Sequence, residues 1–176
     1  MENRKVYYGL MEVAGMRLYV GVSERGLMFV GSNGADIGEM ERWAVRKKGI
    51  DLTENQDEIA PFARELALYL TGARREFDLP LDFAGTAFQE AVWQALLRIP
   101  YGQTRTYSDI ATEIGKPDAV RAVGTAIGAN PILMVIPCHR VIGKNGKITG
   151  YRGGVAMKEQ LLRLESAGSA LPKAAF

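Results

Sequence analysis

Residues that carry reactive chemistry are scarce in this sequence. Its 176 residues contain one cysteine, Cys138, and one histidine, His139. A single cysteine cannot form an internal disulfide, and one cysteine with one histidine is too few for a Cys/His zinc site. We therefore expect a protein without a metal and without any other cofactor.

Long apolar stretches are also missing. The apolar run at 131–138 is far shorter than the roughly 20 residues that a membrane-spanning helix needs. The N-terminal stretch MENRKVYYGL lacks the apolar core of a secretion signal. These absences predict a cytoplasmic protein with no membrane partner. Hydrophobic residues at 47% and charged residues at 24% are ordinary for globular domains and exclude a disordered or collagen-like chain.

Charge is unevenly divided along the chain. Residues 1–85 carry 11 Lys and Arg against 14 Asp and Glu, whereas residues 86–176 carry 11 against 6. A basic second half favours contact with a polyanion. Chance is the competing explanation for a difference this small.

The first half of the chain has an α+β pattern. Runs rich in Val, Tyr and Met, separated by turn residues, predict an antiparallel meander over 6–13, 16–22 and 27–30. Apolar periodicity predicts helices over 35–48 and 58–71, and a further strand is expected over 76–83, broken by Pro80. This half contains no histidine, no cysteine and no glycine-rich phosphate loop. We therefore interpret residues 1–84 as a structural domain.

The second half, residues 85–176, is expected to be a mainly helical domain. Two capping boxes, Thr86 with Gln89 and Thr106 with Asp109, open helices, and the first helix should end before Pro100. Asp118 is expected to cap a third helix that runs to about residue 129. Two short helices joined by a glycine-containing turn indicate a helix-turn-helix. The whole chain is thus predicted to be an α+β protein.

The third of these helices has an unusually bare surface. Its sequence at 119–130, AVRAVGTAIGAN, has Arg121 as its one long polar side chain. Small residues around a single cation suit close approach to a sugar-phosphate backbone with one inserted side chain, as in minor-groove binding. Close packing against another helix explains the small residues equally well.

Reactive residues gather at 138–140. An apolar run at 132–136, expected to be buried on both faces, leads to Cys138, His139 and Arg140, and basic neighbours favour the reactive thiolate. Neighbouring side chains of an extended strand point to opposite faces, so Cys138 and His139 can interact only through a turn at Pro137 or through a water. Glu165, near the end of a final helix over 155–165, is a candidate to orient His139. The alternative is an unreactive buried cysteine.

These residues resemble a known family. The segment IPCHRV at 136–141 is similar to the active-site signature of the O6-alkylguanine-DNA alkyltransferases, the methylated-DNA–protein-cysteine methyltransferases. Three more segments resemble family segments in the same order: RTYSDIA at 105–111, RAVGTAIGANP at 121–131 and GYRGGVAMKEQLL at 150–162. The resemblance covers about residues 86–166.

The resemblance implies DNA repair by direct reversal. An alkyl group would pass from O6-alkylguanine, and alternatively from O4-alkylthymine, to Cys138 in one irreversible turnover after the base is flipped into a pocket. The partner would be double-stranded DNA bound through its minor groove, and the protein would act as a monomer.

The resemblance also implies roles for single residues. Cys138 would be the acceptor, His139 would deprotonate it through a water, and Glu165 would hold His139. Tyr107 would contact the extruded base and protonate the leaving guanine. Arg121 would replace the base in the stack. Further DNA contacts are expected from Ala122, Thr125 and Ala126, and the pocket is expected to include Asn130, which also holds the turn, with Val141, Tyr151, Arg152 and Gly153.

The sequence departs from the family pattern in two ways. Some members carry zinc in the N-terminal half, whose ligands this chain lacks, and Arg152 stands where the pocket wall often has a small residue.

Two other functions are rival hypotheses. A DNA-binding regulator would need no chemistry at Cys138. A cysteine hydrolase would use Cys138, His139 and Glu165 over many turnovers.

Overall fold

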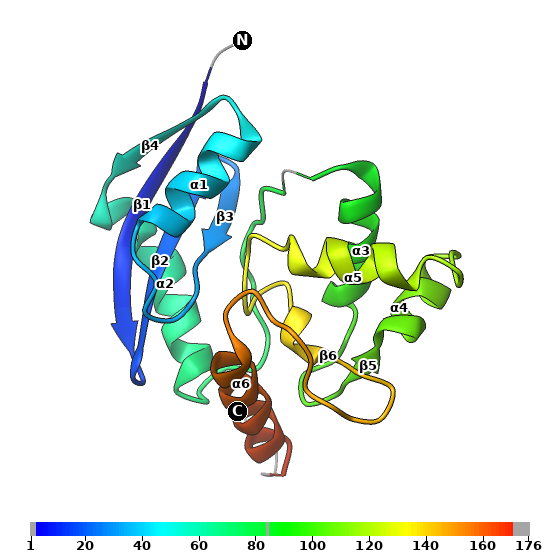
Figure 1. The fold of residues 1–176 in the computed structure, drawn as a ribbon. Helices are drawn as coiled ribbons and strands as arrows, with labels where there is room; N and C mark the ends of the chain where they lie inside the picture. The colour runs from blue at the N-terminus through cyan, green and yellow to red at the C-terminus, as the bar shows by residue number, and fades with distance from the viewer. Residues whose placement is uncertain (1–2, 84, 171–176) are drawn as a thin grey trace.

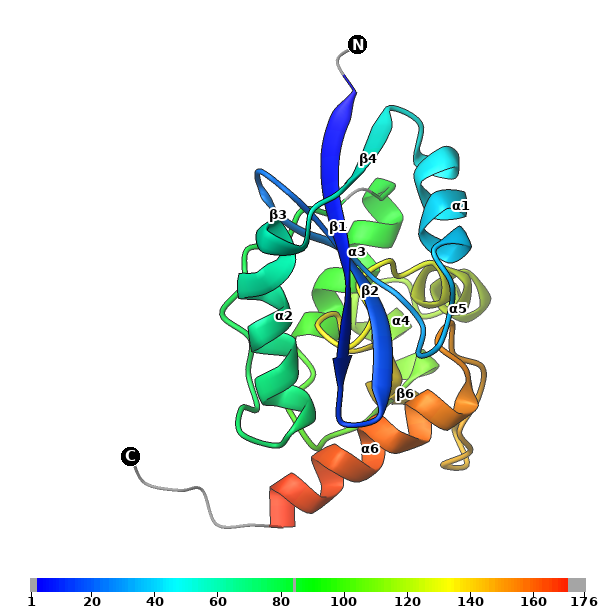
Figure 2. The ribbon, with the colours of Figure 1, turned by 90° about the vertical axis from the view of Figure 1, so that its left-hand side faces the viewer.

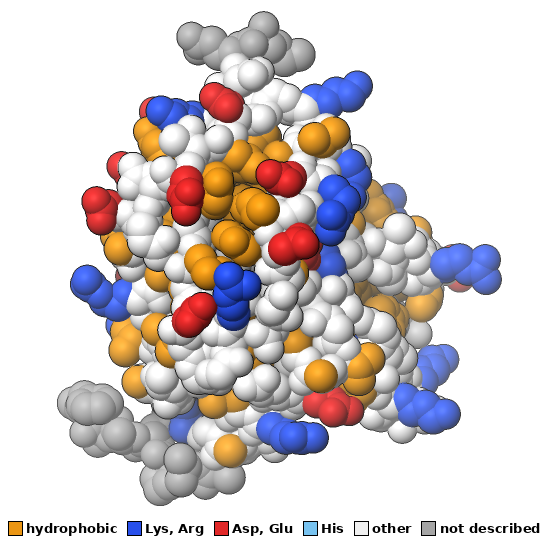
Figure 3. All heavy atoms as spheres, turned by 60° about the vertical axis from the view of Figure 1, so that its left-hand side comes forward, with side chains coloured by type: hydrophobic (Ala, Val, Ile, Leu, Met, Phe, Trp, Pro, Cys, Tyr) orange, Lys and Arg blue, Asp and Glu red, His pale blue; other side chains and the backbone are white. Residues whose placement is uncertain are grey.

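The structure, a computed structural model, describes residues 3–83 and 85–170. It has a sheet-containing N-terminal part beside a mainly helical C-terminal part, as the α+β prediction requires (Figure 1). Ala84, at the expected domain boundary, lies outside the described residues. On the face shown in Figure 3, Asp and Glu side chains lie mainly over the left and middle with some Lys and Arg among them, and most charged side chains at the right-hand edge are Lys and Arg.

The N-terminal sheet has four strands in the order β3-β2-β1-β4. Strands β1 (Arg4–Val13), β2 (Met16–Ser23) and β3 (Gly26–Val30) form the antiparallel meander that the sequence predicts. The sequence pattern does not predict β4 (Ile50–Glu54), which pairs in parallel with β1 from Arg4 opposite Ile50 to Tyr8 opposite Glu54. This edge strand is only five residues long and two of them, Asp51 and Glu54, are acidic, so its sequence gives a weak strand signal.

Two helices cover opposite faces of this sheet (Figure 2). Helix α1 (Gly38–Lys47) buries Met40 and Trp43 against one face. Helix α2 (Gln56–Leu70) begins two residues earlier than predicted, because the Asn55 side chain accepts hydrogen bonds from the backbone N–H groups of Asp57 and Glu58.

The strand expected over residues 76–83 does not form. Only Leu81 makes a bridge, to Leu27 of β3. Pro80 has no N–H to donate, but its carbonyl oxygen accepts from Leu27 N at 2.9 Å. The segment therefore follows the sheet edge without becoming a strand.

The C-terminal part is built from four α-helices and one pair of two-residue strands among the described residues. The helices are α3 (Ala87–Leu97), α4 (Tyr107–Glu113), α5 (Val120–Gly128) and α6 (Val155–Ala170). The strands β5 (Arg105–Thr106) and β6 (Val141–Ile142) pair in parallel.

The helix starts in this part test the predicted caps. Both capping boxes form, at Thr86 with Gln89 and at Thr106 with Asp109. The prediction for Asp118 is wrong: the N-cap of α5 is Ala119, and no side chain caps that helix. Asp118 lies one residue too early, in the preceding turn.

The apolar run at 132–136 is buried, but it is not an extended strand. It turns, with Met134 at a φ of 77°, and only Ile132 bridges to Val30 of β3. The chain turns again at Pro137 into a short 3₁₀ helix, η1 (Cys138–Arg140). The turn at Pro137, one of the two ways in which Cys138 and His139 were expected to interact, is therefore present.

The two parts share one hydrophobic core. The largest cluster of buried apolar residues joins Leu27 and Val30 of the sheet to Leu96 of α3 and Ile132 beside the active-site turn. Among residues 3–83 and 85–170, no helix is long and apolar enough to cross a membrane. Over the same residues, no three His, Cys, Asp or Glu side chains lie together as candidate metal ligands.

Candidate active site

Cys138 faces a cavity of about 310 Å³ between α5 and the loop before α6. Tyr107, Tyr151 and Arg152 line this cavity with Cys138, and glycines supply much of the remaining wall. The sulfur belongs to a side chain that is only 3% exposed. The cavity thus brings three of the predicted pocket and contact residues to the predicted acceptor.

Val141 and Gly153 contribute in other ways. The Val141 carbonyl oxygen accepts a hydrogen bond from Lys158 Nζ at 2.6 Å. Gly153 packs so closely that a Cβ atom there would lie 2.7 Å from the Tyr151 ring and 2.6 Å from the Met157 sulfur. Gly153 therefore lets Tyr151 sit close to the loop backbone.

Asn130 holds the turn that carries the cysteine. Its side chain is fully buried, and its Nδ2 donates to Ile136 O at 2.9 Å and to Cys138 Sγ at 3.1 Å. Its Oδ1 accepts from Ile132 N at 2.9 Å. The Asn130 side chain thus hydrogen-bonds to both ends of the apolar turn and to the Cys138 sulfur.

The Cys138 thiol is not ionised by its surroundings. Burial raises the pKa of Cys138, and the hydrogen bond from Asn130 and the charges of Arg152 and Lys158 offset this only in part. The expectation that adjacent basic residues favour the thiolate is therefore wrong for the resting protein. Deprotonation of Cys138 at neutral pH needs a base.

His139 and Glu165 form a buried pair. His139 Nε2 lies 2.5 Å from Glu165 Oε2, and both side chains are at most 1% exposed. Glu165 also accepts two hydrogen bonds from Arg140, from Nε at 2.7 Å and from Nη2 at 3.1 Å. Tyr69 donates to the same carboxylate.

The surroundings of the pair favour an ionised Glu165 and a neutral His139. Burial opposes ionisation of Glu165, but hydrogen bonds from His139 and Arg140 outweigh it and lower the Glu165 pKa to about 2. Burial lowers the pKa of His139, with Glu165 opposing this shift. A neutral His139 that donates from Nε2 to the carboxylate has its lone pair on Nδ1. This buried Nδ1 atom has no hydrogen-bond partner in the described chain, so it is free to accept a proton.

Three residues with buried polar contacts around the site were not predicted from the sequence: Tyr69 and Arg140, which contact Glu165, and Lys158, which contacts Val141 O. Tyr69 lies on the apolar face of α2, where its sequence position indicates only packing, and Arg140 was expected to act on Cys138 instead of Glu165. Lys158 is 1% exposed and lies within a helix whose charged residues otherwise suggest a solvated face. The one available signal is the presence of Arg140 and Lys158 in the segments that resemble the family.

Helix α5 presents part of its expected surface to solvent. Arg121, Ala122 and Thr125 are exposed on one side of the helix. Ala126 is only 3% exposed, and its carbonyl oxygen accepts from Trp93 Nε1 at 2.9 Å. Ala126 is thus much less accessible than the other three residues expected to contact DNA from α5, and its predicted contact stays a prediction.

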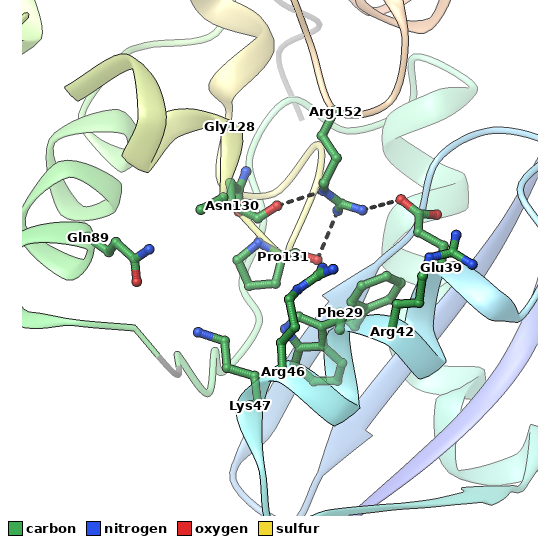
Figure 4. Close-up of a pocket in the computed structure, with 12 residues that line it drawn as sticks. Phe29, Glu39, Arg42, Arg46, Lys47, Gln89, Gly128, Asn130, Pro131 and Arg152 are labelled. Atoms are coloured by element: carbon green, nitrogen blue, oxygen red, sulfur yellow. Dashed lines mark hydrogen bonds and ion pairs between the residues drawn. The ribbon is translucent and has the colours of Figure 1, made fainter. Parts of the chain in front are cut away.

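Tyr107 and Arg152 are both engaged with other parts of the chain. The hydroxyl of Tyr107, which lines the cavity, lies 2.7 Å from Thr149 Oγ1. The Arg152 guanidinium is held by three contacts: Nη2 donates to Val30 O at 2.7 Å, Nε donates to Asn130 O at 2.9 Å, and Nη1 pairs with Glu39 of α1, the last two being drawn in Figure 4. Arg152 thus borders the cavity and leaves its charged group in the contact with the N-terminal part.

Comparison with known proteins gives matches along both parts of the chain. Residues 6–83 match the model of the "6-O-methylguanine DNA methyltransferase, ribonuclease-like domain", and residues 87–167 match the corresponding "DNA binding domain". The inducible methylated-DNA–protein-cysteine methyltransferase of Bacillus subtilis is 52% identical over 172 residues, which cover 96% of each chain. A relative from Methanosarcina barkeri is 55% identical over 115 residues, 65% of this chain and 73% of the relative.

Solved structures give the same result. The crystal structure of the Mycobacterium tuberculosis O6-methylguanine methyltransferase has a TM-score of 0.80 at 38% identity, with 96% of each chain covered. The structure of that protein in complex with DNA has a TM-score of 0.76 at 37% identity, covering 92% of this chain and 94% of the other. Fold and sequence therefore agree on one class, a methyltransferase with a DNA-binding part. The chain belongs to the family of methylated-DNA–protein-cysteine methyltransferases.

Proposed function

We propose that this protein repairs O6-alkylguanine in double-stranded DNA by moving the alkyl group to Cys138 in a single turnover. The observation that carries the proposal is the one cysteine of the chain, which faces a cavity beside the exposed side of α5 and adjoins a histidine with a free lone pair. In the proposed division of labour, residues 1–84 support the domain of residues 85–176, which binds DNA and holds the active site.

Base flipping follows from where the cysteine lies. The reacting oxygen belongs to a stacked base, and Cys138 lines a cavity where it is only 3% exposed, so the nucleotide must leave the duplex to reach it. The small exposed residues Ala122 and Thr125 allow α5 to enter the minor groove, and Arg121 then occupies the space that the base leaves. The M. tuberculosis relative has been solved with DNA, which supports DNA as the partner.

The buried pair supplies the base that the cysteine needs. His139 Nδ1 takes the Cys138 proton through a water, and Glu165 stabilises the imidazolium that forms. Arg140 and Tyr69 keep the carboxylate ionised and oriented. A base close to Cys138 is needed because burial raises the pKa of the thiol, and His139 with Glu165 supplies that base.

The transfer step then balances as a nucleophilic displacement. The thiolate sulfur attacks the saturated alkyl carbon, the bond from that carbon to O6 breaks, and its electron pair passes to guanine. Tyr107 supplies a proton to the leaving base, for which its hydroxyl must leave Thr149. Alkylated Cys138 is a thioether, which is a poor leaving group, so each molecule reacts once.

Several finer points belong to the same proposal. O4-alkylthymine is a second substrate if the cavity admits a pyrimidine. The protein acts as a monomer, because one chain holds the helix, the cavity and the base. Cytoplasmic localisation is proposed because the substrate is cellular DNA.

Mass spectrometry of the intact protein tests the proposal. After incubation with a duplex containing one O6-methylguanine, we expect a gain of one methyl group on the peptide that contains Cys138, saturating at one per chain. The unmodified duplex and the Cys138→Ser variant are the controls, and neither should give a mass gain. An unmodified protein with unrepaired DNA would favour a regulator, and an unmodified protein with repaired DNA would favour an enzyme that turns over.

A further inference from the structure

A second cavity, of about 370 Å³, lies between α1 and the end of α5 (Figure 4). One wall is formed by Arg42, Arg46 and Lys47 of α1, and the facing wall includes Gly128 and Asn130. We call this cavity the α1–α5 cleft. It shares Gly128 and Arg152 with the cavity that holds Cys138, so the two cavities adjoin.

The α1–α5 cleft is strongly basic. Four of its lining residues are cations, and its one carboxylate, Glu39, is already paired with Arg152. None of Arg42, Arg46 and Lys47 forms an ion pair within residues 3–83 and 85–170. Three cations therefore line this space without an ion-pair partner among the described residues.

A favourable interaction with the helix dipole explains only some of the cations on this wall of the cleft. Arg46 and Lys47 lie in the last turn of α1, where cations interact favourably with the helix dipole. Arg42 lies a full turn earlier. Moreover, burial and the neighbouring Arg46 lower the pKa of Lys47, against a weaker opposing effect of Glu90, so these charges repel one another. Such repulsion is relieved when an anion binds between them.

The location indicates which anion fits. The exposed side of α5 carries Arg121 and Thr125, and the same helix ends at Gly128, in the wall of the cleft. A duplex that lies along α5 continues past this end, and the small Gly128 and Ala129 leave its backbone room to approach. DNA presents a phosphate charge at every step along its backbone.

We propose that the α1–α5 cleft binds a phosphate of the DNA backbone that flanks the lesion, through Arg42, Arg46 and Lys47. This inference rests on the proposed function and gives the N-terminal part a direct role in DNA binding. The N-terminal half was expected to be purely structural, since its sequence contains no phosphate-binding loop. Folding creates the site by placing α1 beside the end of a helix that lies more than 70 positions later.

The test compares two variants that each remove two positive charges from the N-terminal part. Arg46→Gln with Lys47→Gln changes the cleft, and Arg25→Gln with Arg64→Gln changes exposed residues outside it. Duplex binding is measured over a salt series. For the cleft variant we expect about tenfold weaker binding at 0.1 M salt and a salt slope smaller by about 0.9, because that is the contribution of one phosphate contact to the slope.

Replacing single DNA phosphates by neutral linkages identifies which phosphate the α1–α5 cleft binds. Methylphosphonate substitutions, introduced one at a time on each side of the lesion, should weaken wild-type binding at one position and leave the cleft variant unaffected there. Equal affinities and salt slopes for the two double variants would overturn the inference. So would binding of inorganic phosphate to the cleft, followed by NMR, if duplex affinity does not change on substitution.

Two measurements distinguish a failure of the phosphate-site proposal from unfolding of a variant and from a failure of the proposed function. The thermal midpoint of each variant establishes that the protein is folded; if Arg46→Gln with Lys47→Gln unfolds it, Arg42→Gln replaces that variant and Arg25→Gln becomes its control. Methyl transfer by the wild-type protein from the same duplex is measured first. Absence of that transfer contradicts the proposed function itself, whereas transfer with unchanged binding by the cleft variant contradicts only the phosphate site.

Discussion

Arg152 and Glu39 form an ion pair that joins the loop beside the acceptor cysteine to helix α1 of the N-terminal part. The same guanidinium donates to the carbonyl oxygens of Val30 and Asn130, so it links the sheet edge to the residue that contacts Cys138 Sγ. The side chains of the pair are 20% and 19% exposed, which limits screening by water. The geometry of the cysteine turn thus depends on a contact between the two parts of the chain.

We predict that Arg152→Met lowers the free energy of unfolding by about 2 kcal/mol, because buried carbonyl groups lose a charged donor. The matched control is Arg163→Met on α6, whose guanidinium belongs to a side chain that is 81% exposed and should contribute less than about 0.5 kcal/mol. Urea denaturation measures both values. Equal losses in the two variants would show that the contact with Glu39 does not stabilise the fold.

Asn130→Ala should raise the pKa of the Cys138 thiol further, because the variant loses the hydrogen bond that favours the thiolate. It should also destabilise the protein by about 2–3 kcal/mol, since Ile136 O and Ile132 N lose their partner in the interior. The thiol pKa is measured from the rate of alkylation by iodoacetamide over a pH series. An unchanged pKa would mean that Asn130 holds the turn without acting on the sulfur.

Acid should destabilise the protein in two stages. His139 has a lowered pKa when folded, so below about pH 6.5 the unfolded chain binds a proton that the folded protein does not, and stability falls. Glu165 has its pKa lowered from 4.5 to about 2, so its contribution is present above pH 4.5 and is lost as the pH falls toward 2.

The size of the second stage should be on the order of 3 kcal/mol, because each pKa unit corresponds to about 1.4 kcal/mol. Urea denaturation between pH 7 and 2.5 measures both stages. Glu165→Gln should lack the second stage, whereas Glu113→Gln, at the exposed end of α4, should retain it. A second stage of unchanged size in Glu165→Gln would assign it to other carboxyl groups.

Arg121→Ala should slow methyl transfer from duplex DNA by at least tenfold and leave the reaction with free O6-alkylguanine base nearly unchanged. The free base needs no extrusion, and Arg121 is exposed on α5 and does not line the cavity that holds Cys138. Single-turnover rates with both substrates measure the difference. Equal losses with both substrates would argue for a general effect on the fold instead of a role in base flipping.

The sequence by itself determined the local features of this protein. The β1–β2–β3 meander and the capping boxes at Thr86 and Thr106 follow from alternation and from side-chain-to-backbone hydrogen bonds within a few residues. The segment IPCHRV identified the candidate acceptor and the family, because a rare run of reactive residues is visible without any fold.

Only the tertiary structure decided the features that depend on residues far apart in the chain. Strand β4 is specified by its pairing with β1, the apolar run at 132–136 is held as a turn by Asn130, and Ala126 is buried by α3. Tyr69 reaches Glu165 across 96 positions, and Arg152 reaches Glu39 across 113. Burial and neighbouring charges, which set the pKa values of Cys138, His139 and Glu165, arise only when these segments pack together.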